Sequence, residues 1–132
     1  MEEIIQEKIS ADHLLYVSLK YTKTCDVIMN LILRWRKMIE TSIEKILEHA
    51  KKKKKISSIP TNPVGQIKEI RELFKKDKEF LAVIDLYEMF RKNVSLKIFY
   101  QGKEIDVNLE KLKEYADMLE KFISKVKQFL ST

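Results

Sequence analysis

Residues that bend or cross-link a backbone are scarce in this chain. Its 132 residues include two glycines, two prolines and one cysteine. Few positions therefore suit sharp turns, which disfavours a fold of many hairpins and favours a few long helices. The single cysteine, Cys25, excludes an internal disulfide and is typical of a reducing compartment, so we expect a cytoplasmic protein.

Long apolar runs are missing as well. No run approaches the roughly 18 residues that a membrane-spanning helix needs, and the first ten residues, MEEIIQEKIS, are acidic where a signal peptide is basic and then apolar. We expect no association with a membrane. The chain is 45% hydrophobic and 35% charged, which is typical of one globular domain over residues 1–132. Frequent Lys, Glu and Ile beside sparse Gln, Asn and Cys are typical of heat-adapted proteins.

The net charge of +6 is unevenly placed. Residues 31–60 hold nine basic and three acidic residues, so their net charge equals that of the whole chain, and five of the basic residues form the lysine run Lys51–Lys55. Such a run binds nucleic acid or another anionic surface weakly and without sequence specificity. It also suits the exposed end of a helix, where cations offset the negative end of the helix dipole. Both interpretations stay open at this point.

A helical stripe of core-type residues starts at Ala11. One helix over the whole stripe would be about 60 Å long, too long for a domain of this size, so we expect a turn within TKTCD at 22–26. The first helix is then predicted at about 3–21 and the second at about 25–54. The stripe recurs at alternating spacings of three and four residues: Ala11, Leu14, Ser18, Tyr21, Cys25, Ile28, Ile32, Trp35, Ile39, Ser42 and Ile46.

The rest of the chain predicts two shorter helices and a long one. Asn62 and Pro63 have the order of a helix cap and a first helical residue, and that helix is expected to run to about residue 76. Another follows to about residue 93, and the last runs from about 108 to 130. β-forming residues around Gln101–Gly102 predict a small β-hairpin at about 96–107. The expected fold class is all-α, a bundle of four or five helices with that hairpin.

Side chains that carry catalysis are few. His13 and His49 lack the Glu three residues earlier that helical iron sites use, and a catalytic zinc needs three ligands, so no metal is expected. Cys25 lies on the apolar stripe, where a cysteine is usually a small core residue. Two glycines do not make a phosphate-binding loop, and no cofactor is expected.

One charged trio stands out before the predicted hairpin. Asp85, Glu88 and Arg91 are spaced by three residues and share one helix face, which is typical of a surface ion-pair ladder. We therefore expect Arg91 to reach Asp85, Glu88 or a carbonyl group near the helix end.

The order of long helices, a proline-bearing loop, short helices, FRKN at 90–93 and a final amphipathic helix resembles the HEPN family (higher eukaryote and prokaryote nucleotide-binding domains). In layout the resemblance covers most of the chain, and in specific residues only about 85–130. It implies an all-helical, often dimeric bundle, in many members a metal-independent RNase with an arginine, a polar residue and then a histidine. Arg91 would take the arginine place, with Asn93 among the polar residues after it.

The chain departs from that motif at the histidine. Leu96, Lys97 and Ile98 fill the places where it is expected, and none of them relays a proton near neutral pH as imidazole does. The resemblance therefore implies a degenerate motif, and we expect no RNase activity.

Three hypotheses follow. The first is a non-catalytic HEPN-like domain that binds a second copy or a partner protein, which the resemblance implies to be a small nucleotidyltransferase or part of a toxin–antitoxin-like module. Apolar residues on the first two helices, Leu14, Tyr21, Ile28 and Trp35, are its predicted interface. The second is a nucleic-acid-binding protein that uses Lys51–Lys55 with Arg34, Arg36 and Lys37. The third is an RNase with an unorthodox base.

Overall fold

The computed structural model describes residues 2–18, 25–92 and 109–132. Within these ranges the chain forms five α-helices and one π-helical turn, and the longest helices are α3, with 28 residues, and α7, with 22. The order is α1 (Glu2–His13), η1 (Leu14–Ser18), α3 (Cys25–Lys52), α4 (Pro63–Leu73), α5 (Lys78–Lys92) and α7 (Leu109–Leu130).

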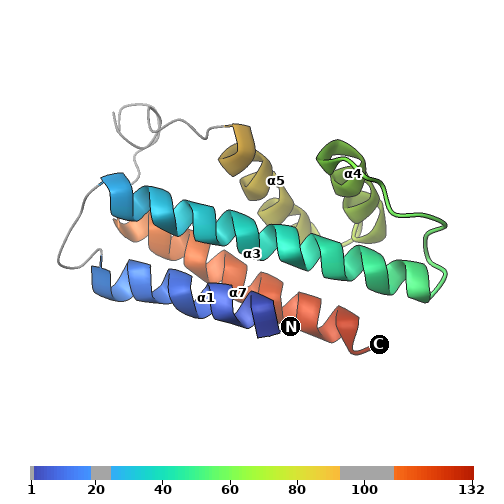
Figure 1. Ribbon diagram of the computed structural model, residues 1–132, viewed down its shortest axis with the longest axis horizontal. Helices are drawn as coiled ribbons and strands as arrows, with labels where there is room; N and C mark the ends of the chain where they lie inside the picture. The colour runs from blue at the N-terminus through green and yellow to red at the C-terminus, as the bar shows by residue number, and fades with distance from the viewer. Residues whose placement is uncertain (1, 19–24, 93–108) are drawn as a thin grey trace.

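Helix α3 contacts every other described helix. It lies beside α7 and runs in the same direction, while α4 and α5 cover one side of this pair and α1 covers the other (Figure 1). Helix α1 is antiparallel to both (Figure 1). Its consecutive residues Glu7 and Lys8 form ion pairs with α3 and α7 respectively, so α1 lies in the groove between the two long helices.

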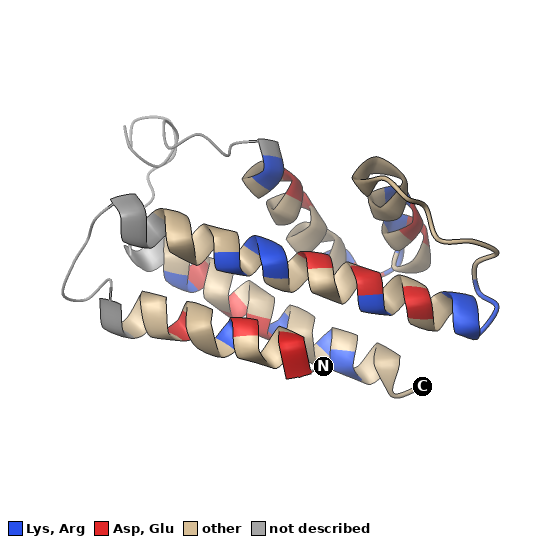
Figure 2. Ribbon diagram, viewed as in Figure 1, with Lys and Arg blue, Asp and Glu red and all other residues tan. Residues whose placement is uncertain are grey.

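The solvent side of α3 carries its charges in blocks. Basic and acidic segments follow one another along the helix (Figure 2). From the amino end, the blocks are first Arg34, Arg36 and Lys37, then Glu40, Glu44 and Glu48, and finally the lysine run Lys51–Lys55 that ends the helix. The half-buried Lys45 lies within the acidic block. Each block therefore presents to its neighbours a charge opposite in sign to that of the block before it.

The buried side of α3 follows the predicted stripe. Its members from Ile32 to Ile46 are all buried, as the spacing predicts for a helix with one apolar face. The small member, Ser42, is completely buried and donates its hydroxyl to the Met38 carbonyl oxygen at 2.8 Å. This bond satisfies the hydroxyl group, which would otherwise cost free energy in the core. The part of the stripe from Ile32 to Ile46 is confirmed.

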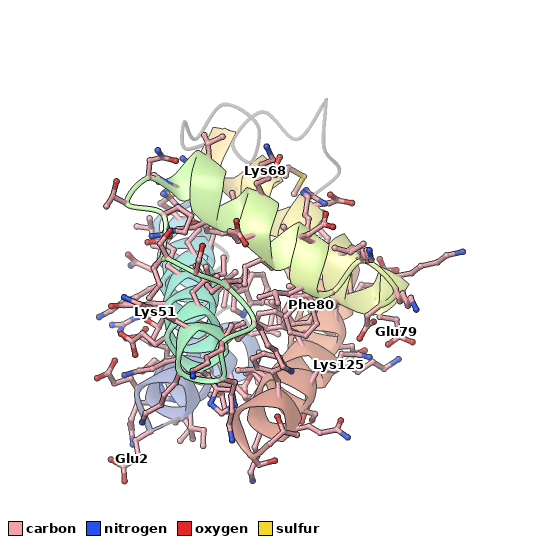
Figure 3. All side chains as sticks on the ribbon, turned by 90° about the vertical axis from the view of Figure 1, so that its right-hand side faces the viewer. Glu2, Lys51, Lys68, Glu79, Phe80 and Lys125 are labelled. Carbon is pink, nitrogen blue, oxygen red and sulfur yellow. The ribbon has the colours of Figure 1, made fainter. Side chains whose placement is uncertain are left out.

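Aromatic rings join the helices at two places. Toward the amino end of α3, the Trp35 ring stacks on Phe90 from α5 at 6.1 Å and meets the edge of Tyr115 from α7 at 6.3 Å. Toward the other end, Phe80 stacks on Phe74 at 3.8 Å and packs on Phe122 at 4.9 Å. Figure 3 shows Phe80 pointing between the helices into the core. These rings fix α5 against α3 and α7.

The helix starts at 63 and 78 have side-chain caps. The Asn62 side chain accepts a hydrogen bond from the Gly65 amide at 2.6 Å, and Pro63 follows as the first helical residue, as predicted. Gly65 fits there because a Cβ atom would lie 2.8 Å from the Pro60 Cβ. The Asp77 carboxylate caps α5 by accepting from the Phe80 amide at 3.1 Å.

The predicted fold class is wrong in its β-hairpin. Within the described ranges the regular elements are all helices and no strand is present, so the fold is corrected to an all-helical bundle. The segment at 96–107 lies outside the described residues, and so does most of the turn predicted at 22–26. The physical weakness of the prediction is that two strands alone are marginally stable, and these ranges offer no strand for a hairpin to pair with.

The ion pair between Asp77 and Lys125 makes stability depend on pH. Burial alone would raise the pKa of Asp77, but the hydrogen bonds from Lys125, at 2.8 Å, and from the Phe80 amide outweigh it and lower the pKa from its ordinary value of 3.8. A carboxyl group whose folded pKa is lowered stabilises the fold above its unfolded pKa, and this contribution is lost as the pH falls through the folded pKa.

We predict that Asp77→Asn lowers the free energy of unfolding at pH 7 by about 0.5–1 kcal/mol, because asparagine keeps the cap acceptor but loses the partly exposed ion pair. The difference between the two proteins should shrink as the pH falls below about 4 and vanish below the folded pKa of Asp77, where the wild-type carboxyl group is protonated in both states. Urea unfolding of both proteins at several pH values measures this difference in free energy of unfolding. A difference that stays constant with pH would contradict this assignment.

Candidate functional site

Arg91 lies near the carboxyl end of α5 and is half-buried. Its guanidinium carbon is 5.8 Å from the centre of the Tyr87 ring, one helical turn earlier. Arg71 from α4 takes both carboxylates that Arg91 was expected to reach, Asp85 at 2.7 Å and Glu88 at 3.0 Å, so that part of the expectation is wrong. The third expected partner, a carbonyl group near the helix end, stays a prediction. Arg91 therefore lies over the face of the Tyr87 ring, and the described residues contain no ion-pair partner for it.

Tyr87 is the centre of a small polar cluster. Its side chain is 4% exposed, and burial together with the nearby Glu40 carboxylate raises its pKa to about 12, against the opposing effect of Arg91 and Arg36. The phenol therefore stays protonated at neutral pH. Arg36 lies 3.9 Å from Glu40, and its buried Nε atom has no hydrogen-bond partner among the described residues. The cluster holds fixed charges and a hydrogen-bond donor.

Two cavities flank this cluster and share Ile67. The larger, of about 420 Å³, is lined by Val64, Ile67, Glu88 and Arg91. The smaller, of about 320 Å³, lies between α3 and α4 and has an acidic rim of Glu40, Glu44 and Glu48 above Ile43, Ile59, Pro63, Gln66, Ile67 and Tyr87. Their size and mixed lining suit binding of a side chain or a small group.

The two histidines lie elsewhere. His13 is exposed at the end of α1, and His49 lies on α3, half-buried, with its ring against the edge of Phe129 at 5.4 Å. Neither lines the cavity that contains Arg91. Within the described ranges, no three His, Cys, Asp or Glu side chains gather where they could hold a metal ion.

The lysine run ends α3 in a defined turn. Lys54 has a φ of 60°, and the Lys55 amide reaches back to the Ala50 carbonyl oxygen at 2.8 Å while the Lys54 amide reaches Lys51 at 3.0 Å. This is a Schellman ending, which usually places glycine where Lys54 stands. All five lysine side chains are exposed, and Lys55 lies over the Phe129 ring at 5.0 Å. The run is therefore both a helix end and an exposed basic surface.

The predicted interface residues are only partly on the surface. Trp35 is 2% exposed and belongs to the core, while Leu14 is half-buried against the core. Tyr21 and Asn93 lie outside the described residues, and the side chain of Ile28 is not among those described.

An exposed apolar line that was not predicted from the sequence lies on α1 and η1. Ile5, Ile9 and Tyr16 are 38%, 55% and 50% exposed. Ile5 and Ile9 are one turn apart, and Tyr16 follows two turns later, so all three share one side of the helix. The spacing of these residues could have indicated a second apolar side of the helix, but the predicted stripe starts at Ala11 and includes none of them. We call these three residues the outer line of α1.

We predict that Arg91→Ala lowers the free energy of unfolding by about 0.5–1 kcal/mol, because it removes one cation–π contact of a half-buried arginine. Arg71→Ala is the matched control, since it removes the same charge but also two charge-assisted hydrogen bonds, and should cost about 1–2 kcal/mol. Thermal unfolding of both variants measures the two costs. Equal losses would contradict the assigned partners.

A labelled-RNA cleavage assay with the same proteins tests Arg91 for catalysis. We expect no cleavage by the wild type. If the wild type cleaves RNA and Arg91→Ala stops it without changing the melting temperature, Arg91 is catalytic and the degenerate-motif hypothesis fails.

No helix in the described part of the chain is long and apolar enough to cross a membrane. No family model matches the chain, and no curated protein or solved structure matches it either.

Proposed function

We propose that this chain is a HEPN-like helical domain that acts by binding protein rather than by catalysis, first of all by pairing with a second copy of itself. The observation that carries the proposal is the outer line of α1, Ile5, Ile9 and Tyr16, which is exposed on a helix whose other side is already buried. Ile4, Ala11 and Leu15 face the core with no more than 1% exposure. A surface helix needs only one apolar side in a monomer.

A second copy suits this surface. Two α1 helices packed antiparallel around a two-fold axis would bring the same three side chains together from each copy, as symmetric dimers do. Ile and Tyr supply the large apolar contacts that interfaces favour. Neighbouring exposed residues from the rest of α1 would complete the contact, because a stable interface needs about 800 Å² from each partner.

The HEPN-like part of the proposal rests on layout and on Arg91. Shorter α4 and α5 lie on one side of the long helices α3 and α7, and α5 ends in Arg91 and Lys92 as the resemblance requires. In that family setting the chain would serve as the binding half of a two-component module, beside a small nucleotidyltransferase or within a toxin–antitoxin-like pair. The identity of a neighbouring gene would test this setting.

The dimer is tested by light scattering at tens of micromolar protein. We predict a mass of twice 15.7 kDa for the wild type and 15.7 kDa for Ile9→Glu, because the substitution places a charge in the middle of the outer line. Val64→Glu is the matched control, since Val64 is 73% exposed on α4, away from α1, and its variant should stay dimeric. A monomeric wild type would refute self-association.

A second candidate function is weak nucleic-acid binding through the lysine run. It is favoured because Lys51–Lys54 are exposed and form no ion pair with any described residue. Phosphates would meet cations that are not already neutralised.

A gel-shift assay with single-stranded RNA tests this function. Replacing Lys51, Lys52 and Lys53 by Ser should abolish a weak shift, or lower the slope of log affinity against log salt by about 2. The matched control replaces Lys75, Lys76 and Lys78, three exposed lysines at the α4–α5 connection, and should bind as the wild type does. Loss of binding in both variants would mean that net charge, not the run, decides affinity.

A further inference from the structure

Helix α1 fills only part of the groove between α3 and α7. The Glu7 carboxylate lies 3.4 Å from Arg34 and 3.2 Å from Lys37, and α1 is antiparallel to α3, so α1 begins beside about residue 41 of α3. From there to Lys52, about 16 Å of α3 has no α1 beside it. Figure 1 shows α3 and α7 continuing past the amino end of α1.

A cavity of about 610 Å³, which we call the open groove, lies at this end of α3 and is lined by residues of α3, by Ile59 of the loop that follows and by Leu130 at the end of α7. Its apolar surface comes from Ile59 and Leu130, and the ring of His49 packs beside Phe129. Its remaining lining residues are three lysines and one acid: Lys45, Lys51, Lys52 and Glu48. An apolar floor with a basic rim is thus left open to solvent.

The covered part shows how this groove holds a helix. On the α3 side, Arg34 and Lys37 bind Glu7 of α1, whose side chain is only 12% exposed. On the α7 side, Glu120 lies 3.9 Å from Lys8. A buried apolar side of α1 lies between these ion pairs. The groove therefore selects a helix by one apolar side and by charges on its two flanks.

The same two edges of α3 and α7 continue past the amino end of α1 with changed charges. Lys45 lies 11 residues beyond Arg34 and Lys52 lies 18 residues beyond it, which is about three and about five turns of helix. Both lysines therefore extend the edge of α3 that Arg34 begins. Lys127 lies seven residues beyond Glu120 and extends that edge of α7, where it is exposed. The edge of α3 thus carries Lys45 and Lys52 with Glu48 between them, the edge of α7 carries Lys127, and none of the three lysines forms an ion pair with a described residue.

We propose that the open groove binds a short acidic amphipathic helix of a partner protein, laid end to end with α1. The length of the groove suits two to three helical turns, its apolar floor takes one side of such a helix, and the lysines on both edges take carboxylates on its flanks. A nucleic acid would meet the lysines but would leave the apolar floor unused. The open groove is separate from the outer line of α1, so this inference goes beyond the proposed dimer and is tested independently of it.

The probe is a labelled synthetic peptide of residues 2–13, the acidic helix that the covered part of the groove already holds, with Lys8→Glu so that both of its flanks are acidic. Added to the full chain, it should bind saturably with a Kd on the order of 100 µM, measured by fluorescence anisotropy. Lys45→Gln with Lys52→Gln should weaken binding roughly fivefold, because two carboxylate contacts are lost. The matched control, Lys53→Gln with Lys54→Gln, removes the same charge outside the groove and should change the Kd less than about twofold.

Three results would overturn the proposal. They are no saturable binding up to about 1 mM peptide, equal weakening by both pairs of substitutions, and equal competition by a single-stranded RNA. A peptide that merely displaced α1 would respond to Arg34→Gln and not to the Lys45 and Lys52 pair, and this result also counts against the open groove. The Ile9→Glu protein should bind the peptide as the wild type does, which separates failure of the groove from failure of the dimer.

Discussion

The stacking of Trp35 between α5 and α7 is the contact on which the arrangement of the bundle depends. Its ring meets Phe90 and Tyr115, and these two rings meet each other at 5.9 Å, so one side chain of α3 fixes two other helices at the same level. Arg91 follows Phe90 directly in the sequence. Its place over Tyr87 is thus set by the core and not by an ion pair on the surface.

Because α3 is buried against every other helix, only a narrow strip of it reaches solvent, and the charges on that strip decide what lies next to it. The first basic block meets Glu7 of α1. The acidic block forms the rim of the cavity toward α4. Lys51 and Lys52 at the end of the helix, together with Lys45, face the open groove. A single helix therefore distributes distinct binding chemistries along its length, and the boundary between filled and open surface is set by where α1 begins.

Much of the fold could be predicted because it depends on local periodicity. The α3 part of the stripe and the cap at Asn62 follow from spacing alone. The partner of Arg91 could not, because residue spacing sees only neighbours on the same helix, and the competing Arg71 comes from α4. Trp35 was misplaced for a related reason, since a stripe shows that a residue is apolar but not which side of the helix other helices cover. The β-hairpin prediction relied on two strands, the arrangement with the least support from tertiary contacts.

The outer line of α1 and the open groove have one physical origin, which is that α1 is a short helix on a long groove. The inner side of α1 buries Ile4, Ala11 and Leu15, and Glu7 pairs with two cations of α3. The apolar surface and the first basic residues of the groove are therefore covered and paired as far as α1 extends. Beyond that point the same groove keeps its apolar floor, while Lys45 and Lys52 continue the edge that Arg34 begins. Covering this floor with another apolar surface removes it from water, and a carboxylate beside each lysine offsets the cost of bringing those cations into a contact. The contact that α1 makes within the chain therefore indicates how a helix of a partner protein would bind. The partner helix needs acidic residues on both flanks, whereas α1 has an acidic residue, Glu7, on one flank and a lysine, Lys8, on the other.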